Sequence, residues 1–324
     1  MLEECLYAFG ARKLLENVGN IKAHEKVLIV SDFKMSKVAE RLANTLAALG
    51  AEFVLCYMEP RKWDCQEPPD MVAVAMKQAD VIVIPVSVSI AWTNAVTSAR
   101  EQGARIMLMT GFTDDIFASP ALIETNFQQR ADLCAKLSEL YDKASLVRLS
   151  TPSGTDFTFR KEGRKANKVG PIPVPGEIRA APDIEINVVP LEGTSSGTLI
   201  IDGSIPYLGI GVLNEPVECV VEDGLITSIK GDLNAKRLSD NLASFNNKNV
   251  YNIAEFGVGL NPNARLCGTM LEDEGVFGTI HIGIGSSEFF GGLVSAPIHY
   301  DLIIKNVRIE LDGVVVQDNK TLYL

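Results

Sequence analysis

The stretch KVLIVSDFKMSKVAERLANTLAALGAEFVLCY, residues 26–57, decides the fold of the first part of the chain. It opens with a short apolar run, continues with apolar residues three and four positions apart, and ends, after Gly50, in a second apolar run. The two runs are typical of strands buried on both faces, and the middle segment is typical of an amphipathic helix that stops at a glycine. The stretch therefore predicts a strand, a helix and a second strand parallel to the first.

The same alternation continues to about residue 109. Further apolar runs occupy residues 80–86 and 105–109, and helical spacing covers residues 69–79 and 92–103. Strands of this kind separated by helices predict a doubly wound α/β domain with a parallel sheet covered on both faces. The domain lacks a nucleotide motif, because SDFKMSK follows the first strand without a glycine and no strand is followed by GxxxxGK[ST].

The pattern changes near residue 146. A long helical segment, residues 119–145, leads into short strands of alternating polarity, where VEDGLITSI (221–229) and IELDGVVVQ (309–317) carry the Asp-Gly pair of tight hairpins. We therefore expect two domains. Residues 1–145 should form a Rossmann-like or flavodoxin-like domain, and residues 146–324 a mostly antiparallel β (α+β) domain that binds metal.

The overall charge restricts the partners of the protein. The 324 residues include 41 acidic and 30 basic side chains, a formal net charge of −11, which disfavours nucleic acid and anionic membrane surfaces as partners. The N-terminal sequence does not resemble a signal peptide, and no apolar span approaches 20 residues. Six scattered cysteines without a CxxC pair are typical of reduced thiols. A cytoplasmic location is expected.

The stretch APIHYDLIIKN, residues 296–306, contains a candidate metal site. Residues two apart in a strand point to the same face, so His299 and Asp301 lie side by side with Tyr300 turned away. Such a pair provides two ligands for a divalent cation. The alternative is an ordinary polar pair.

Other segments of the second domain offer further ligands. His281 lies in the glycine-rich GTIHIGIG (278–285), Glu177 follows a Pro-Gly turn, and Glu255 lies between Ala254 and Phe256. A carboxylate in apolar surroundings is costly to bury unless a cation accompanies it. The alternatives are a tight strand crossing for His281 and solvated turn acids for the two glutamates. The run MLEDEG (270–275) adds Glu272, Asp273 and Glu274, although most of that run is expected to be a solvated loop.

These segments resemble the metal-site segments of the aminopeptidase T and aminopeptidase S family of metallopeptidases. In that family two metal ions are held by a glutamate in a GE turn, a glutamate before a glycine-rich run, a histidine in an HxxxG strand and a closing HxD. The resemblance assigns these roles to Glu177, Glu255, His281, His299 and Asp301, and assigns a further acid to Glu274. The tyrosine that the family places shortly after the HxxxG histidine is missing, because HIGIGSSEFF has Glu288 and Phe289 there.

The sequence also resembles, along its whole length, the 2,5-dihydroxypyridine 5,6-dioxygenases, ring-opening enzymes with one ferrous ion. The resemblance rests on EGTSSGTLIIDG, VYNIAEFGVGLNPNAR and HYDLIIKN. Those enzymes bind iron through the HxD pair and through a histidine at the position of Glu255. They lack counterparts of Glu177 and His281, both present here, and this difference favours the two-metal pattern.

The ligand count and the first resemblance together predict a hydrolase, most simply an aminopeptidase. We expect two divalent ions, Zn²⁺, Mn²⁺ or Co²⁺, bridged by Glu255, with a peptide or small amide as substrate. Glu272 and Glu274 are the candidate general bases. The family resemblance suggests a homodimer. The first alternative is a dioxygenase with one Fe²⁺, in which His281 completes a triad with His299 and Asp301. The second is a homologue that binds ligands without chemistry.

Overall fold

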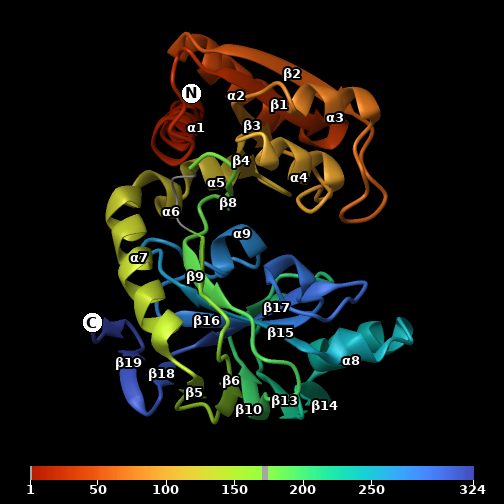
Figure 1. Cartoon of the computed structure of the whole chain (residues 1–324), viewed down its shortest axis with the longest axis vertical. Helices are drawn as coiled ribbons and strands as arrows, with labels where there is room; N and C mark the ends of the chain where they lie inside the picture. Colours follow the sequence, from red (N-terminus) through yellow and green to blue (C-terminus); the bar gives the residue numbers. More distant parts are fainter. Residues whose placement is uncertain (1, 170–173) are drawn as a thin grey trace. The chain divides into compact units, whose positions relative to one another are not determined.

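The computed structural model describes residues 2–169 and 174–324, and the chain divides into two compact units (Figure 1). Unit 1 consists of Met1–Ala131 and Gly170–Pro182, and unit 2 of Asp132–Val169 and Asp183–Leu324. The predicted ranges 1–145 and 146–324 do not include this return of the chain to unit 1. The returning strand, β8 (Ile178–Ala180), has only 3 residues and follows a Pro-Gly turn, so it has no periodicity to detect.

Unit 1 is built on a five-stranded sheet of order β2-β1-β3-β4-β8, in which all four pairings are parallel. The first four strands in the chain are β1 (Lys26–Asp32), β2 (Glu52–Met58), β3 (Val81–Ile84) and β4 (Arg105–Leu108). The helices between them are α2 (Ser36–Leu49), α3 (Asp70–Met76) and α4 (Asn94–Glu101). Gly50 ends α2 with a φ of +72°, a left-handed conformation that favours glycine. The predicted parallel α/β fold is confirmed.

The remaining helices of unit 1 flank this sheet in sequence. They are α1 (Leu2–Lys13), α5 (Asp114–Ala118) and α6 (Pro120–Ile123), with a π-helical turn at Leu14–Val18 and a 3₁₀ turn at Phe33–Met35. The prediction of one long helix over residues 119–145 is wrong, because α6 and α7 (Phe127–Lys143) are separate. The side chain of Asn126 accepts a hydrogen bond of 3.1 Å from the backbone N–H of Gln129, an N-cap that starts a new helix.

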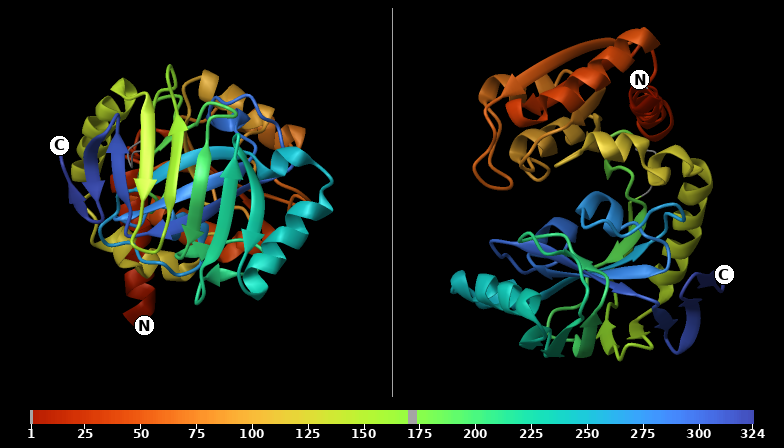
Figure 2. Two further views of the ribbon diagram at one scale, coloured as in Figure 1. Left: turned by 90° about the horizontal axis from the view of Figure 1, so that it is seen from below. Right: turned by 180° about the vertical axis from the view of Figure 1, so that it is seen from behind.

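Unit 2 contains two larger antiparallel sheets and a two-stranded ribbon. The eight-stranded sheet has the order β14-β13-β10-β6-β5-β18-β19-β20, and the five-stranded sheet has the order β17-β16-β15-β9-β7. Figure 2 shows the eight-stranded sheet face on, with helix α8 (Leu233–Ser244, cyan) packed beside β14. The predicted, mostly antiparallel second part is confirmed.

The strands of unit 2 are short. The eight-stranded sheet contains β5 (Leu146–Ser150), β6 (Asp156–Arg160), β10 (Ser196–Ile201), β13 (Val217–Glu222), β14 (Leu225–Lys230), β18 (Arg308–Leu311), β19 (Val314–Asp318) and β20 (Thr321–Leu322). The five-stranded sheet contains β7 (Asn167–Val169), β9 (Glu185–Val188), β15 (Ile253–Gly259), β16 (Thr279–Gly285) and β17 (His299–Lys305). The ribbon pairs β11 (Ser204–Ile205) with β12 (Gly211–Val212). Besides α7 and α8, unit 2 has the short helix α9 (Met270–Asp273) and 3₁₀ turns at Lys248–Tyr251 and Glu288–Phe290.

Both Asp-Gly hairpins form as predicted. Asp223 and Gly224 join β13 to β14 with φ of +47° and +79°, and Asp312 and Gly313 join β18 to β19 with φ of +50° and +83°. Positive φ at both central residues is the condition for a tight turn that matches the twist of the strands. The turns therefore fix the register of each hairpin.

The two faces of the five-stranded sheet differ in chemistry. In β16, Ile280, Ile282 and Ile284 alternate with His281, Gly283 and Gly285, and β15 alternates in the same way. The apolar face packs on the rest of unit 2, where the ring of Phe256 lies 5.3 Å from that of Phe159 in β6 and 6.1 Å from that of Tyr141 in α7. The opposite face carries glycines and ionisable groups.

None of the helices in the described ranges is both long and apolar enough to cross a bilayer. All six cysteines are free thiols. Disulfide bonds therefore do not contribute to the stability of either unit.

Lys161 has an unusual position, fully buried at the C-terminal end of α7. Its ammonium group donates hydrogen bonds to the carbonyl oxygens of Tyr141, at 2.6 Å, and Ala144, at 3.1 Å. The last carbonyls of a helix lack partners within the helix, and a cation interacts favourably with that end of the helix dipole. Lys161 therefore joins the strand β6 to the end of α7.

We expect Lys161→Met to lower the free energy of unfolding by about 1–3 kcal/mol, because two buried carbonyl groups lose a charged donor. Urea-induced unfolding followed by circular dichroism measures the change. The control is Lys143→Met, which removes an exposed lysine from the last turn of the same helix and should change the free energy by less than about 0.5 kcal/mol. Equal losses in both variants would contradict a capping role for Lys161.

Candidate metal centre

Strand register brings four of the five predicted ligands together on one face of the five-stranded sheet. Glu255 in β15 pairs with Gly283 in β16, which in turn pairs with Asp301 in β17. On the neighbouring rung, His281 pairs with Gly257. Paired residues in a sheet point to the same face, so these side chains share one small area.

Two glycines provide the space for these side chains. A Cβ atom at Gly257 would lie 1.9 Å from His281 Nε2, and a Cβ at Gly283 would lie 2.7 Å from both Glu255 Cβ and His299 Cε1. Real Cβ atoms do not approach other atoms so closely. The imidazole and carboxylate groups thus occupy positions that any other residue at these two sites would block.

Glu255, His299 and Asp301 form the first ligand group. His299 Nε2 lies 2.9 Å from Glu255 Oε2 and 3.3 Å from Asp301 Oδ1, while His299 Nδ1 lies 2.8 Å from the carbonyl oxygen of Ser286. A carbonyl oxygen only accepts, so Nδ1 carries a proton. Nε2 then faces two carboxylates, either with a second proton or with a lone pair available to a metal ion.

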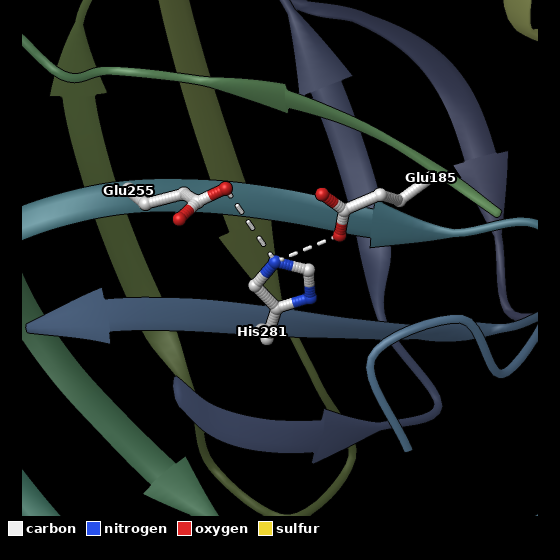
Figure 3. Close-up of side chains that lie close together, drawn as sticks. All are labelled: Glu185, Glu255 and His281. Carbon is white, nitrogen blue, oxygen red and sulfur yellow. Dashed lines mark ion pairs between the residues drawn. The ribbon is translucent and has the colours of Figure 1, made fainter. Parts of the chain in front are cut away.

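Glu185, Glu255 and His281 form a second group that shares Glu255 with the first (Figure 3). His281 Nε2 lies 3.0 Å from Glu185 Oε2 and 3.8 Å from Glu255 Oε1. Asn187 donates a hydrogen bond of 2.8 Å to the other oxygen of Glu185. Glu255 and His281 are only 2% and 1% exposed.

Asp183, Glu185 and Glu274 form a third group of potential ligand atoms. One oxygen of each carboxylate is buried without a well-directed hydrogen bond, as is Asp301 Oδ1. Buried polar atoms are normally satisfied. The carboxylates of Asp183, Glu185 and Glu274 each offer an oxygen within 4.8 Å of the others. Among the described residues, the carboxylates of all three groups pair with no lysine or arginine, and their ion-pair partners are His281 and His299.

The pKa values show how strongly the charges interact. Burial raises the pKa of Asp183 and of Glu274 well above the usual range, and the neighbouring carboxylates raise both further. Burial also raises the pKa of Glu185, which His281 opposes. For His281 and His299, burial lowers the pKa, but the surrounding carboxylates outweigh burial and raise both pKa values well above the usual range. Protons therefore neutralise this cluster when no other cation does.

Glu255 and Asp301 behave differently from the other acids. Burial raises the pKa of each carboxyl group, but the adjacent imidazoles more than reverse this and hold both pKa values below the usual range. These two stay anionic beside His299. Anionic oxygens, imidazole nitrogens and uncompensated negative charge fit a divalent cation, with Fe²⁺, Mn²⁺ and Zn²⁺ all compatible with such a mixed set.

Not every predicted residue joins the cluster. Glu177 lies in unit 1, where its carboxylate pairs with Arg179 and accepts a hydrogen bond of 3.0 Å from the backbone N–H of Val174. Glu272 is buried and accepts a hydrogen bond of 3.2 Å from the backbone N–H of Arg265. No ligand group of the described residues includes either glutamate, because each has a partner of its own nearby.

The sequence prediction missed three residues of this site. Asp183 and Glu185 come from APDIEINV, where acids alternate with isoleucine at the same two-residue spacing as His299 and Asp301, a signal that was available. Tyr207, from the segment between β11 and β12, donates a hydrogen bond of 2.7 Å to Asp301 Oδ2. Nothing in the local sequence of that tyrosine indicates its partner.

The alternative triad, with His281 joining His299 and Asp301, is not formed by these side-chain positions. No ligand group among the described residues contains both histidines. The carboxylate of Glu255 lies between them, with one oxygen toward each imidazole. The first ligand group therefore offers a metal ion one imidazole, from His299, and two carboxylates, from Glu255 and Asp301.

Comparison with known families identifies the relatives of this site. The family model of 2,5-dihydroxypyridine 5,6-dioxygenase matches residues 11–323. The chain belongs to the 2,5-dihydroxypyridine 5,6-dioxygenase family. A 2,5-dihydroxypyridine 5,6-dioxygenase from Pseudomonas putida is 31% identical over 137 residues, which span 39% of this chain and 39% of that protein.

Two solved structures share the fold of this family member. The structure of 2,5-dihydroxypyridine dioxygenase from Pseudomonas putida KT2440 gives a TM-score of 0.84 at 20% identity, over 98% of this chain and 96% of that chain. Wild-type AmpT from Thermus thermophilus gives 0.68 at 14% identity, over 98% and 99%. At these identities the likeness establishes the fold alone, including the expected relation to the aminopeptidase fold.

The predicted aminopeptidase activity is wrong, because a dioxygenase family matches the chain almost end to end and AmpT is the less similar fold. The same finding removes the hydrolase and protease assignments and leaves an enzyme of the dioxygenase family. The error has a physical origin. Counting carboxylates and imidazoles shows which cations a site accepts, but it does not show whether water or dioxygen reacts there.

Metal affinity should rise with pH. His299 has a raised pKa in the metal-free site, so its Nε2 must release a proton before a cation binds at the first ligand group. Between about pH 6 and about pH 8 we expect the Kd for Mn²⁺ to fall at least about tenfold, with protons released into the buffer. Calorimetric titrations in buffers of different ionisation enthalpy measure both quantities. A Kd independent of pH would show that the ligands are already deprotonated.

Gly283→Ala should weaken metal binding by about 10-fold to 100-fold, because the new methyl group displaces Glu255 and the His299 ring. The control is Ile282→Val, a change of one methylene on the opposite face that costs about 0.5–1.5 kcal/mol of stability. Mn²⁺ titration of both metal-free variants gives the comparison. Normal affinity in Gly283→Ala would mean that the two ligand side chains do not require this space.

Proposed function

We propose that this protein is a metal-dependent dioxygenase that opens the ring of a dihydroxylated pyridine or a closely similar aromatic compound. The observation that carries the proposal is the group of Glu255, His299 and Asp301, with both carboxylates buried, in a chain that the dioxygenase family model matches almost end to end. The proposed cofactor is one Fe²⁺ at this group. When bound, ferrous iron supplies the electrons that activate dioxygen and a position that binds a substrate hydroxyl group.

The residues of the chain prepare this group for its ion. The carbonyl of Ser286 accepts from His299 Nδ1 and so directs Nε2 toward the two carboxylates. The lowered pKa values of Glu255 and Asp301 keep both anionic. Two of the three ligands are thus oriented and anionic before the ion arrives, and only His299 must release a proton.

An aromatic substrate has a suitable surface beside His299. The side chain of His299 is 18% exposed, whereas that of Glu255 is 3% exposed, so the first group is open on the histidine side. The ring of Phe290 lies 5.1 Å from the imidazole at an angle of 46°. A planar ring that approaches His299 would meet an aromatic edge or face, a favourable contact for aromatic compounds.

For the second and third groups we propose protons rather than a second metal ion. In the metal-free site burial raises the pKa of Asp183, Glu185 and Glu274, so protons are sufficient to neutralise these acids. A protonated Glu274 in this position is a candidate general acid, whereas Glu272 is engaged by the backbone of Arg265. One metal ion with protonated acids beside it thus takes the place of the expected pair of ions.

The stoichiometry of metal binding tests the single-ion assignment. Anaerobic titration of metal-free protein with Fe²⁺ should saturate at one tight equivalent per chain, and Glu185→Gln should leave that number at one. His299→Ala should weaken the tight site by at least about 100-fold, because it removes an inner ligand. Two tight equivalents in the unaltered protein would overturn the single-ion assignment.

Oxygen consumption tests the reaction. Ring opening breaks one carbon–carbon bond and places both atoms of one O₂ in the product, so no external reductant is needed. We expect Fe²⁺-loaded protein to consume one O₂ for each 2,5-dihydroxypyridine opened, and a chelator to stop the reaction. His299→Ala should lower the rate at least about 100-fold, whereas His24→Ala, which removes an exposed histidine of unit 1, should not. Tight Fe²⁺ binding without O₂ uptake on any dihydroxylated pyridine would contradict the proposal.

A further inference from the structure

The phenol of Tyr207 makes a direct contact with the proposed metal site. Its hydroxyl donates a hydrogen bond of 2.7 Å to Asp301 Oδ2, although 94 residues separate the two in sequence. An ionised carboxylate only accepts hydrogen bonds, so the phenol is the donor. Tyr207 is thus a partner of a proposed ligand and not itself one of the ligands.

The two oxygens of Asp301 have different surroundings. Oδ2 accepts from Tyr207, whereas Oδ1 is buried without a hydrogen bond and lies 3.3 Å from His299 Nε2. The free oxygen is the one that faces the imidazole nitrogen available to a cation. The hydrogen bond from Tyr207 therefore fixes which oxygen of Asp301 faces the ligand group.

The position of Tyr207 is itself fixed by β17. Its ring stacks on that of Tyr300, with centroids 4.6 Å apart and an angle of 27° between the planes. At the start of the same segment, the N–H of Gly203 donates a hydrogen bond of 2.9 Å to the carbonyl oxygen of Ile303, and a Cβ at Gly203 would lie 2.7 Å from that oxygen. Two contacts on one strand thus hold the phenol above Asp301.

We propose that Tyr207 is a positioning residue that holds Asp301 Oδ2 and directs Oδ1 alone toward the metal ion. The inference rests on the proposed metal site at Glu255, His299 and Asp301, and it does not depend on which reaction the ion supports. Partners that orient a metal ligand typically change metal affinity by about 10-fold to 100-fold when removed. A carboxylate released from such a partner is free to rotate, so its geometry toward the ion also changes.

The test compares Tyr207→Phe with Tyr300→Phe in the full-length protein. Each variant keeps its aromatic ring and loses one hydroxyl group, and the hydroxyl of Tyr300 donates instead to Asn241 Oδ1, at 3.2 Å. Calorimetric titration of the metal-free proteins with Mn²⁺ gives the Kd, and the visible absorption spectrum of Co²⁺-loaded protein reports the geometry around the ion. Thermal unfolding of the metal-free variants shows whether the fold is intact.

We expect Tyr207→Phe to raise the Kd for Mn²⁺ by about 10-fold to 100-fold and to alter the Co²⁺ spectrum, whereas Tyr300→Phe should change the Kd less than about twofold. The metal-free unfolding midpoints should match that of the unaltered protein. An unchanged Kd and spectrum in Tyr207→Phe would overturn the inference, and so would equal weakening in both variants. If the Kd values for Mn²⁺ change as expected but the Fe²⁺-loaded protein takes up no O₂, the proposed reaction is refuted and the role of Tyr207 stands.

Discussion

Repulsion between carboxylates that are buried side by side is the constraint on which unit 2 depends. Glu185, Glu255 and Asp301 lie on strands of one five-stranded sheet, and Asp183 and Glu274 complete the ligand groups beside them. Moving carboxylates out of water is costly unless opposite charge accompanies them. Two imidazoles provide part of that charge, and protons or a cation must provide the rest. The apolar face of the same sheet, anchored by Phe256 against Phe159, supplies the packing that keeps the repelling groups in place.

The glycines of β15 and β16 make room for the charged side chains on this sheet. They remove side chains from the rungs where Glu255, His281 and His299 need room, so the charged groups approach one another without distorting the strands. Continuous pairing of β15, β16 and β17 then fixes the distances between ligands that are far apart in sequence. A group of residues that fits a cation is thus positioned by the backbone, and the family relationship is the basis for the reaction proposed for that group.

Much of this structure was predictable from local sequence patterns. Apolar runs and helical spacing predicted the parallel sheet of unit 1, and the Asp-Gly pairs predicted both hairpins, because these features depend on neighbouring residues. Four of the five predicted metal ligands converge, since two-residue spacing in a strand determines which side chains share a face. The same rule would also have found Glu185, which alternates with isoleucine in DIEI. Glu177 precedes a three-residue strand, and only the long-range pairing of that strand with β4 shows that it belongs to unit 1. Tyr207 was out of reach for the same reason, as its contact spans 94 residues.

The path of the chain between the units has a consequence for how the protein is made and divided. Unit 1 obtains its last strand, β8, only after residues of unit 2 have been synthesised, so the edge of β4 lacks its partner while the chain emerges from the ribosome. Exposed strand edges of this kind invite pairing with other chains. Cutting the chain near residue 146 would leave β8 on the wrong fragment and separate α7 from the strands it covers. Neither half obtained by such a cut contains all the residues of one unit and no others.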